Sequence, residues 1–195
     1  MSARHSTDIY VGIGSNLGSR EQNLYQAVSA LRTAGFPLLA ESSIYETEPV
    51  DYLEQPWFLN QVVRVAPPQL RSPRGASAEE FLRRLQAIEQ MMGRERHSRA
   101  GPRVIDLDLL LWGSAIMGSA EAPPAPGPAT RDKATAKCDG LVDLVVPHPR
   151  LHLRRFVLVP LSEIAEDLVH PVLRKTIGML LAEVADRSIV RLYRR

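Results

Sequence analysis

The order of strand-like and helix-like segments along the chain constrains its fold more than any other feature. Four short segments carry the β-branched, aromatic or alternating apolar residues typical of strands: 9–13, 38–45, 59–66 and 103–112. Two amphipathic segments separate them, one behind a capping-box pattern at Ser19–Gln22 and one behind a second pattern at Ser77–Glu80. The resulting β-α-β-β-α-β order predicts an α+β, ferredoxin-like domain with a mostly antiparallel sheet.

This fold carries further expectations for the sheet and for the rest of the chain. We expect both helices on one face of the sheet, the other face open for a ligand, and 103–112 as a central strand. Apolar segments at 156–161 and 177–184 predict C-terminal additions, and 189–193 predicts an edge strand. Residues 114–140 are rich in proline and alanine without periodicity, which predicts a flexible insertion in a single domain spanning 1–195.

Composition excludes several classes of function. Lys and Arg number 24 against 22 Asp and Glu, and a net charge of +2 predicts no general attraction to nucleic acid or to anionic membranes. The single cysteine, Cys138, forms no internal disulfide and offers no second thiolate for a zinc site. Neither a signal-peptide pattern nor a run of about 18 apolar residues occurs, so we expect a cytoplasmic protein without a membrane span.

Two aspartates carry the sharpest chemical signal. Asp106 and Asp108 are two residues apart in a predicted strand, so their side chains share one face. Adjacent carboxylates repel each other unless a cation joins them, and such oxygen ligands suit Mg²⁺ that also binds substrate phosphates. The alternative interpretation is that both carboxylates simply face solvent on an exposed sheet surface.

A basic loop directly precedes these aspartates. It contains four arginines: Arg94, Arg96, Arg99 and Arg103. Guanidinium groups bind phosphate oxygens in pairs, so this loop beside two carboxylates indicates phosphate chemistry. A solvated loop, or one that forms salt bridges with the aspartates, is the alternative.

Other polar and aromatic residues could complete a substrate site. His148 lies in a second basic cluster with Arg154, where a histidine can donate a hydrogen bond to phosphate. Trp57 and Phe58 beside Asn60 could stack on a flat heterocycle and bind its edge, although core packing explains either aromatic equally well.

The glycines of residues 12–18 do not change this interpretation. Their spacing fits neither the Walker pattern nor the dinucleotide pattern, and it predicts only a tight turn between a strand and a helix.

Four separated blocks of sequence occur in an order typical of one enzyme family. They are YVGIGSNLGSREQNL, SSIYETEPV followed by QPWFLNQVV, IEQMMGRERHSRAGPRVIDLDLLLWG and VPHPRLHLRRFVLVPLSEIAEDLVHP. In these blocks the chain resembles the 6-hydroxymethyl-7,8-dihydropterin pyrophosphokinases of folate biosynthesis. The resemblance implies the ferredoxin-like fold and transfer of the β,γ-diphosphate of ATP to the hydroxymethyl group of the pterin, with release of AMP.

The resemblance also implies roles for particular residues. Asp106 and Asp108 would bind two Mg²⁺ ions across the ATP triphosphate. The catalytic arginines would be Arg94, Arg96 and Arg103. The positions that match nucleotide contacts are Gln86, Glu89, His148 and Arg154. Those that match pterin contacts are Thr47, Val50, Phe58, Asn60 and Phe156. The expected partners are ATP and 6-hydroxymethyl-7,8-dihydropterin, bound to a monomer that binds neither nucleic acid nor membrane.

The chain departs from the family pattern in one motif and in two connections. Ala100 stands where relatives usually carry tryptophan before Gly-Pro-Arg, which removes one packing anchor of the arginine loop. The stretches 71–76 and 114–140 are longer than usual. Two other hypotheses stay open from sequence: a ferredoxin-like nucleic-acid-binding module, and an inactive relative that serves as an interaction protein. Mg²⁺-dependent production of AMP would separate these hypotheses from the enzyme.

Overall fold

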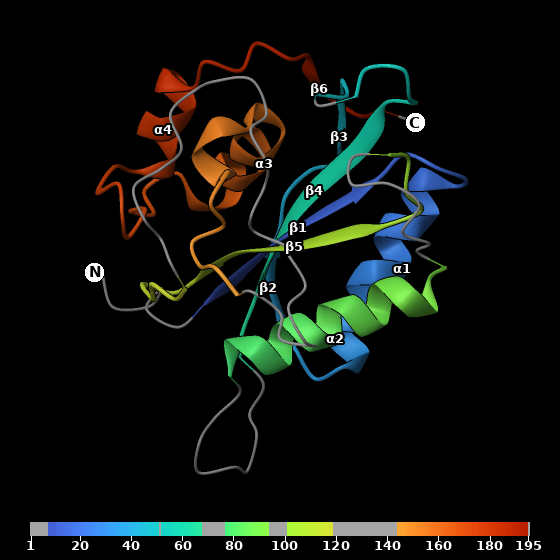
Figure 1. Ribbon diagram of the computed structural model, residues 1–195, viewed down its shortest axis with the longest axis horizontal. Coiled ribbons are helices and arrows are strands. Elements are labelled where there is room, and N and C mark those ends of the chain that lie inside the picture. The colour runs from blue at the N-terminus through green and yellow to red at the C-terminus, as the bar shows by residue number, and fades with distance from the viewer. Residues whose placement is uncertain (1–7, 51, 68–76, 94–100, 119–143, 195) are drawn as a thin grey trace.

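The computed structural model describes residues 8–50, 52–67, 77–93, 101–118 and 144–194 (Figure 1). The strands are β1 (Ile9–Ser15), β2 (Leu38–Glu41), β3 (Tyr45–Thr47), β4 (Phe58–Val65), β5 (Asp106–Trp112) and β6 (Val190–Leu192). The helices are α1 (Arg20–Thr33), α2 (Ala78–Met91), the short 3-10 turn η2 (Leu151–Leu153), α3 (Arg155–Ala165) and α4 (Ile177–Glu183). The order from β1 to β5 confirms the ferredoxin-like prediction, with the second predicted strand divided into β2 and β3.

All strand pairs of the sheet are antiparallel. Its order is β5-β1-β4-β3-β6, and β2 pairs with β4 beside β3. The strand predicted at 38–45 therefore breaks into β2 and β3. It breaks at Ser42, whose hydroxyl accepts the backbone N–H of Val62. β6 lies at the sheet edge, as the pattern of 189–193 predicted.

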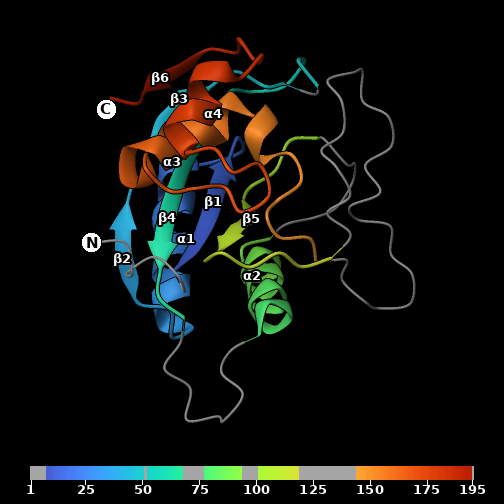
Figure 2. The ribbon, with the colours of Figure 1, turned by 90° about the vertical axis from the view of Figure 1, so that its left-hand side faces the viewer.

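One face of the sheet is covered by α1 and α2 (Figure 2). The apolar positions of α1 that the periodicity predicts are buried: Leu24, Ala27, Val28 and Leu31. The second capping box is partly realised, because the Ser77 hydroxyl accepts the Glu80 backbone N–H. The first is wrong: Ser19 is the residue before α1, but its side chain makes no capping hydrogen bond.

The other face of the sheet is not left open, which corrects the prediction. α3 and α4 pack on it around a second core that includes Tyr10, Val62, Leu110 and Leu111. Figures 1 and 2 show these helices on the side opposite α1 and α2. The C-terminal apolar segments cover one end of the face, so the part available to a ligand is the end where β4 and β5 begin.

The prediction that 103–112 is a central strand is wrong. β5 begins at Asp106 and pairs only with β1 among the described strands, so it lies at the edge of the sheet. Its sequence looks central because its leucines are buried on both faces and because residues 144–148 run beside it, with the His148 N–H donating to the Leu110 carbonyl. A register shift opposite Tyr10 also breaks the alternation, so Leu110 and Leu111 both join the second core.

Two sequence predictions concern segments that the structure describes little or not at all. Most of the 114–140 insertion lies outside the described residues, although Met117 near its start bridges to Val146 after its end. The long stretch at 71–76 also lies outside them. Across the described part of the chain, none of the helices combines the length and the apolar character that crossing a membrane requires.

Candidate functional site

The candidate site is organised by one row of residues that crosses the sheet. On β1, Gly14 pairs with Asp106 of β5 on one side and with Asn60 of β4 on the other, and Asn60 in turn pairs with Tyr45 of β3. Paired residues on neighbouring strands point to the same face. The predicted metal ligand and the predicted pterin amide are therefore two strands apart on one face, with a glycine between them.

Because Gly14 has no side chain, the Asn60 amide oxygen can lie directly over it. A Cβ built on Gly14 would lie 2.7 Å from Asn60 Oδ1, closer than real Cβ contacts allow. Gly12, which pairs with Asp108, has more room: its Cβ would meet only Leu110 side-chain atoms, from 3.5 Å. The two glycines thus differ, because only Gly14 makes space for a functional side chain.

A first group of side chains, the charged wall, consists of Arg103, Asp106, Asp108 and Arg154. Arg103 Nη1 donates to Asp106 Oδ2 at 2.8 Å, and Arg154 Nη1 lies 3.9 Å from Asp108 Oδ2. The Arg103–Asp106 salt bridge agrees with the alternative interpretation of the arginine loop, whereas the Arg154–Asp108 pair comes from the second basic cluster and was not predicted. The carboxylates stay accessible, with 22% of the Asp106 side chain and 36% of the Asp108 side chain exposed.

These two carboxylates fit a magnesium site. They share one face of β5, they are hard oxygen ligands, and both side chains are partly exposed. One or two carboxylates with waters and substrate phosphates are the usual ligand set of Mg²⁺ in enzymes that bind nucleotides.

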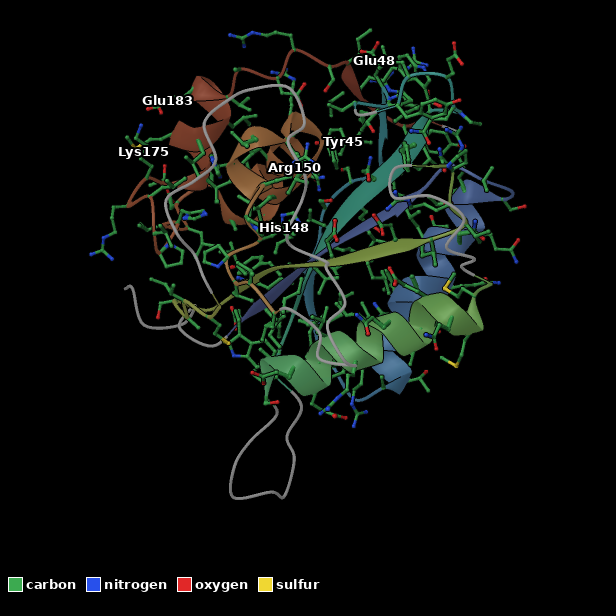
Figure 3. All side chains as sticks on the ribbon, in the orientation of Figure 1. Tyr45, Glu48, His148, Arg150, Lys175 and Glu183 are labelled. Carbon is green, nitrogen blue, oxygen red and sulfur yellow. The ribbon has the colours of Figure 1, made fainter. Side chains whose placement is uncertain are left out.

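Arg154 is the residue before α3, and it links the charged wall to an aromatic ring. Its guanidinium carbon lies 5.5 Å from the centre of the Phe156 ring, over the ring face. His148 lies in the segment before α3, as Figure 3 shows together with Arg150. His148 Nδ1 accepts the Arg150 backbone N–H at 3.2 Å, so the neutral ring carries its proton on Nε2. Nε2 is then a hydrogen-bond donor suited to a phosphate oxygen.

A second group, the amide wall, consists of Thr47, Phe58 and Asn60. Asn60 Nδ2 donates to Thr47 Oγ1 at 2.7 Å, and both residues are buried. This bond orients the amide so that Oδ1 lies over Gly14. Phe58 begins β4 one step along the same face, half-buried. The amide wall offers a fixed acceptor beside an aromatic ring.

Tyr45 follows Asn60 in the row and pairs in turn with Leu192 of β6 (Figure 3). Its hydroxyl donates to Glu163 Oε2 of α3 at 2.9 Å. Burial, together with this hydrogen bond, raises the pKa of Tyr45 to about 12, so the phenol is a neutral donor near pH 7. The same carboxylate accepts the N–H and the hydroxyl of Ser43, which ties α3 to the turn between β2 and β3.

Some predicted site residues lie apart from these walls. Val50 lies in the loop between β3 and β4 (residues 48–57, here the β3–β4 loop), where its side chain is 41% exposed. Gln86 and Glu89 lie on α2, across the sheet from α3. Glu89 is buried and accepts the Leu107 backbone N–H at 2.7 Å, between the two aspartates. Arg94, Arg96 and Ala100 lie outside the described residues.

The sequence analysis missed a cluster that anchors the β3–β4 loop. Glu46 accepts hydrogen bonds from Arg20 of α1 at 3.0 Å and from Arg191 of β6 at 2.6 Å. These bonds, chiefly that of Arg191, lower the pKa of Glu46. Arg20 also donates to the Trp57 carbonyl, and the Arg191 guanidinium lies 4.9 Å from the Trp57 ring centre. Trp57, predicted as a stacking residue for a ligand, thus has a cation on its ring.

The geometry defines a class of protein. A charged wall with two carboxylates suits a polyphosphate and its metal, and an amide wall on the same face suits a flat polar ring. The two walls lie at the end of a ferredoxin-like sheet, on β5 and β4, with the strand β1 between them. A site of this kind belongs to an enzyme that transfers a phosphoryl or diphosphoryl group to a small ring compound.

Comparison with known families identifies which of these enzymes the chain resembles. The family model described as 7,8-dihydro-6-hydroxymethylpterin-pyrophosphokinase (HPPK) matches residues 10–166. A pyrophosphokinase of Bacillus subtilis is 36% identical over 160 residues, which cover 82% of this chain and 78% of that protein. A Haemophilus influenzae pyrophosphokinase is 32% identical over 184 residues, covering 94% of this chain and 96% of that one. The chain therefore belongs to the HPPK family, whose members are pyrophosphokinases of folate synthesis.

Longer relatives contain the same domain. The folic acid synthesis protein fol1 of Pneumocystis carinii is 33% identical over 181 residues, covering 93% of this chain but 20% of that protein. A crystal structure of Plasmodium falciparum HPPK-DHPS with pteroate matches with a TM-score of 0.62 and 14% identity, over 93% of this chain and 44% of that one. The chain thus spans about a fifth of the first relative and under half of the second, and the structural match supports the fold.

Proposed function

We propose that this chain transfers the β,γ-diphosphate of ATP to the hydroxymethyl group of 6-hydroxymethyl-7,8-dihydropterin and releases AMP. The observation that carries the proposal is the row Asp106–Gly14–Asn60, which holds the charged wall and the amide wall on one face of the sheet. The reaction needs a polyphosphate beside a flat polar acceptor, and the two walls match these two halves. The choice of ATP as donor and the pterin as acceptor follows from membership of the HPPK family.

The charged wall is proposed to bind the nucleotide. Asp106 and Asp108 would hold two Mg²⁺ ions, which when bound would offset the charge of the phosphates. Arg103, together with Arg94 and Arg96 of the preceding loop, would bind the transferred diphosphate. His148 and Arg154 would contact the phosphates or the ribose. Gln86 and Glu89 keep their proposed role near the nucleotide through the family pattern, and the buried Glu89 would act through the backbone of β5.

The amide wall is proposed to bind the pterin. Asn60 Oδ1 would accept hydrogen bonds from the ring edge, and its orientation is already fixed by Thr47. Phe58 and Phe156 would stack on the two faces of the ring, and Val50 would cover it from the β3–β4 loop. Arg154 against the Phe156 ring supports this arrangement, because it places one pterin residue beside one nucleotide residue.

The chemical step then depends on alignment. The pterin hydroxyl oxygen attacks the β-phosphorus, the bond from that phosphorus to the α,β-bridging oxygen breaks, and AMP leaves with both electrons of the bond. The hydroxyl proton goes to solvent, and we assign no general base. Arginines of the charged wall stabilise the charge that develops on the bridging and equatorial oxygens.

We further propose that residues 1–195 form a single pyrophosphokinase domain, with 114–140 as a flexible insertion. A monomer in the cytoplasm that binds ATP and the pterin, but neither nucleic acid nor membrane, agrees with the net charge of +2 and with the single cysteine.

The test is AMP production from Mg-ATP with and without 6-hydroxymethyl-7,8-dihydropterin. We expect AMP only when pterin and metal are both present, and a loss of about a hundredfold or more with Asp106→Ala or Asp108→Ala. Circular dichroism of each variant serves as the folding control. A folded wild-type chain that makes no AMP would overturn the proposal in favour of an inactive relative. AMP formed without pterin would overturn the proposed acceptor.

A further inference from the structure

Asn16 is the residue that follows β1, and its place in the sheet is unusual. β1 lies between β4 and β5, and both neighbours run antiparallel to it. The end of β1 therefore lies beside the starts of β4 and β5. β4 begins with Phe58 of the amide wall, and β5 begins with Asp106 of the charged wall. A side chain at position 16 can reach the segments that lead into both walls.

The Asn16 side chain bonds to both segments at once. Its Nδ2 donates to Gln55 Oε1 and to the Pro56 carbonyl, each at 3.0 Å, at the end of the β3–β4 loop. Its Oδ1 accepts the Arg103 backbone N–H at 2.7 Å, and its own backbone N–H donates to the Arg103 carbonyl at 3.1 Å. The residue is 2% exposed. Both amide hydrogens and the amide oxygen are therefore engaged between two loops.

The chemistry of an amide suits this position. The Arg103 N–H requires an acceptor, and the Pro56 carbonyl requires a donor, so the two ends of the amide cannot be exchanged. Aspartate supplies the acceptor but not the donor, and alanine supplies neither. Buried polar groups that lose their partners are costly, so each partner segment depends on the amide for its position.

The two partner segments carry opposite halves of the proposed reaction. The β3–β4 loop bears Val50 and leads through Trp57 into Phe58. Arg103 donates from its guanidinium to Asp106, so the position of its backbone affects the charged wall. We propose that Asn16 is a positioning residue that holds the β3–β4 loop in register with Arg103, so that acceptor and nucleotide meet in line. The inference rests on the proposed function and adds to it the residue that joins the two substrate walls.

Two substitutions at position 16 separate the two sides of the amide. With Asn16→Asp, which keeps the oxygen for Arg103, we expect the KM for the pterin to rise about tenfold or more, because both hydrogen bonds to the loop are lost. The KM for Mg-ATP should stay within about twofold, because the Arg103 side keeps its acceptor. With Asn16→Ala, kcat should fall as well, and kcat/KM for the pterin should fall about a hundredfold, as expected for a misaligned attack.

Asn23 provides a matched control. Its Nδ2 bonds to Ser15 Oγ, to the Leu17 carbonyl and to the Val104 carbonyl, so it holds the same turn and the same approach to β5. These bonds do not include the β3–β4 loop. Asn23→Ala should therefore lower the melting temperature without raising the KM for the pterin. Equal changes of that KM in Asn16→Ala and Asn23→Ala, or an unchanged KM in Asn16→Asp, would overturn the proposal.

Hydrogen exchange measured by mass spectrometry tests the coupling without any turnover. Asn16→Asp should speed exchange only in peptides covering 52–59, whereas Asn16→Ala should also speed it in peptides covering 101–106. Unchanged exchange in 52–59 for both variants would contradict the role of Asn16 even in an active enzyme. If the two variants show these changes in exchange but the wild-type protein makes no AMP, the result would instead contradict the proposed function.

Discussion

The charged wall and the amide wall hold their polar groups in different ways. In the charged wall, Asp106 and Asp108 are partly exposed and each lies beside an arginine. In the amide wall, Asn60 and Thr47 are 9% and 1% exposed and satisfy each other through a 2.7 Å hydrogen bond. Exposed ion pairs contribute little stability and exchange partners easily, whereas a buried hydrogen bond is costly to break. The charged wall can therefore rearrange on binding the proposed polyphosphate, whereas the amide wall is already ordered without the proposed ring ligand.

The largest expected effect comes from removing one charge of the charged wall. Asp106→Asn or Asp108→Asn should lower kcat/KM for Mg-ATP by about a hundredfold or more, because a metal ligand is lost. The free energy of unfolding should change by less than about 1 kcal/mol, because the broken ion pair is partly exposed. Glu80→Gln on α2 is the matched control, since Glu80 also pairs with arginines but lies far along the chain from the site. A large loss of stability would show that the aspartates are structural.

A buried histidine extends the comparison to the layer of α3 and α4. His170 is 4% exposed, and burial, together with nearby His152, lowers its pKa from 6.5 to about 4. Its Nδ1 accepts the N–H groups of Val172 and Leu173, so the folded protein holds a neutral ring. The unfolded chain binds the extra proton below about pH 6.5, so stability is present above that pH and is lost as the pH falls toward 4.

The lowered pKa of His170 predicts a measurable change in the free energy of unfolding with pH. Between pH 7 and pH 5 the stabilisation lost through His170 should be about 2 kcal/mol, from the linkage of proton binding to unfolding. Urea unfolding at both pH values measures it, and His170→Gln should remove most of the pH dependence. His152→Gln is the comparison: burial also lowers the pKa of His152, and His152 adds to the shift of His170, so this variant should remove a smaller part of the pH dependence. An equally steep dependence in His170→Gln would assign the effect to other groups.

Substitutions at Gly14 and Gly12 of β1 test how firmly the Asn60 amide is held in place. Gly14→Ala should raise the KM for the pterin about tenfold, because its Cβ would displace the Asn60 amide oxygen from its fixed place. Gly12→Ala, where the Cβ meets ordinary van der Waals contacts, should leave that KM within about twofold. Steady-state kinetics with both substrates checks the pair. Equal effects of the two substitutions would show that the amide wall moves freely.

The smallest expected effect comes from Tyr45→Phe, which tests whether Tyr45 belongs to the amide wall. Tyr45→Phe removes one of several hydrogen bonds to the exposed Glu163 carboxylate, so stability should fall by less than about 1 kcal/mol. The KM for the pterin should stay unchanged, although Tyr45 is the next residue of the row after Asn60. Thermal unfolding and pterin titration measure both. A clear rise in KM would make Tyr45 part of the amide wall.

Local patterns were sufficient to predict much of the fold. The capping serine of α2, the periodic apolar residues of α1 and the edge strand β6 depend on residues close in sequence. The edge position of β5 was missed because its outer side is covered by residues 144–148, far along the chain. The cover of α3 and α4 on the second face was also missed, since apolar segments alone do not say which surface they bury.

The same contrast holds for the site. Asp106 and Asp108 were identifiable because their spacing on one strand already places them on one face. The family resemblance supplied Asn60 and Thr47, and the hydrogen bond between them needs the register of β3 and β4. Asn16 was taken only as part of a turn, because its partners at 55–56 and 103 come from distant segments. A pattern of neighbours in sequence carries no information about such contacts.

The row Asp106–Gly14–Asn60 also fixes a length. Hydrogen-bonded strands lie about 4.8 Å apart, so two strand spacings separate the backbones of Asp106 and Asn60 by about 10 Å. Small movements of side chains do not change this distance, because the β-sheet hydrogen bonds on both sides of Gly14 hold the three strands together. The sheet thus sets the distance between Asn60, the proposed contact to the ring edge, and Asp106, a proposed metal ligand. An acceptor whose hydroxyl stands one methylene farther from its ring would overshoot the point of attack, and moving a single side chain would not correct the mismatch.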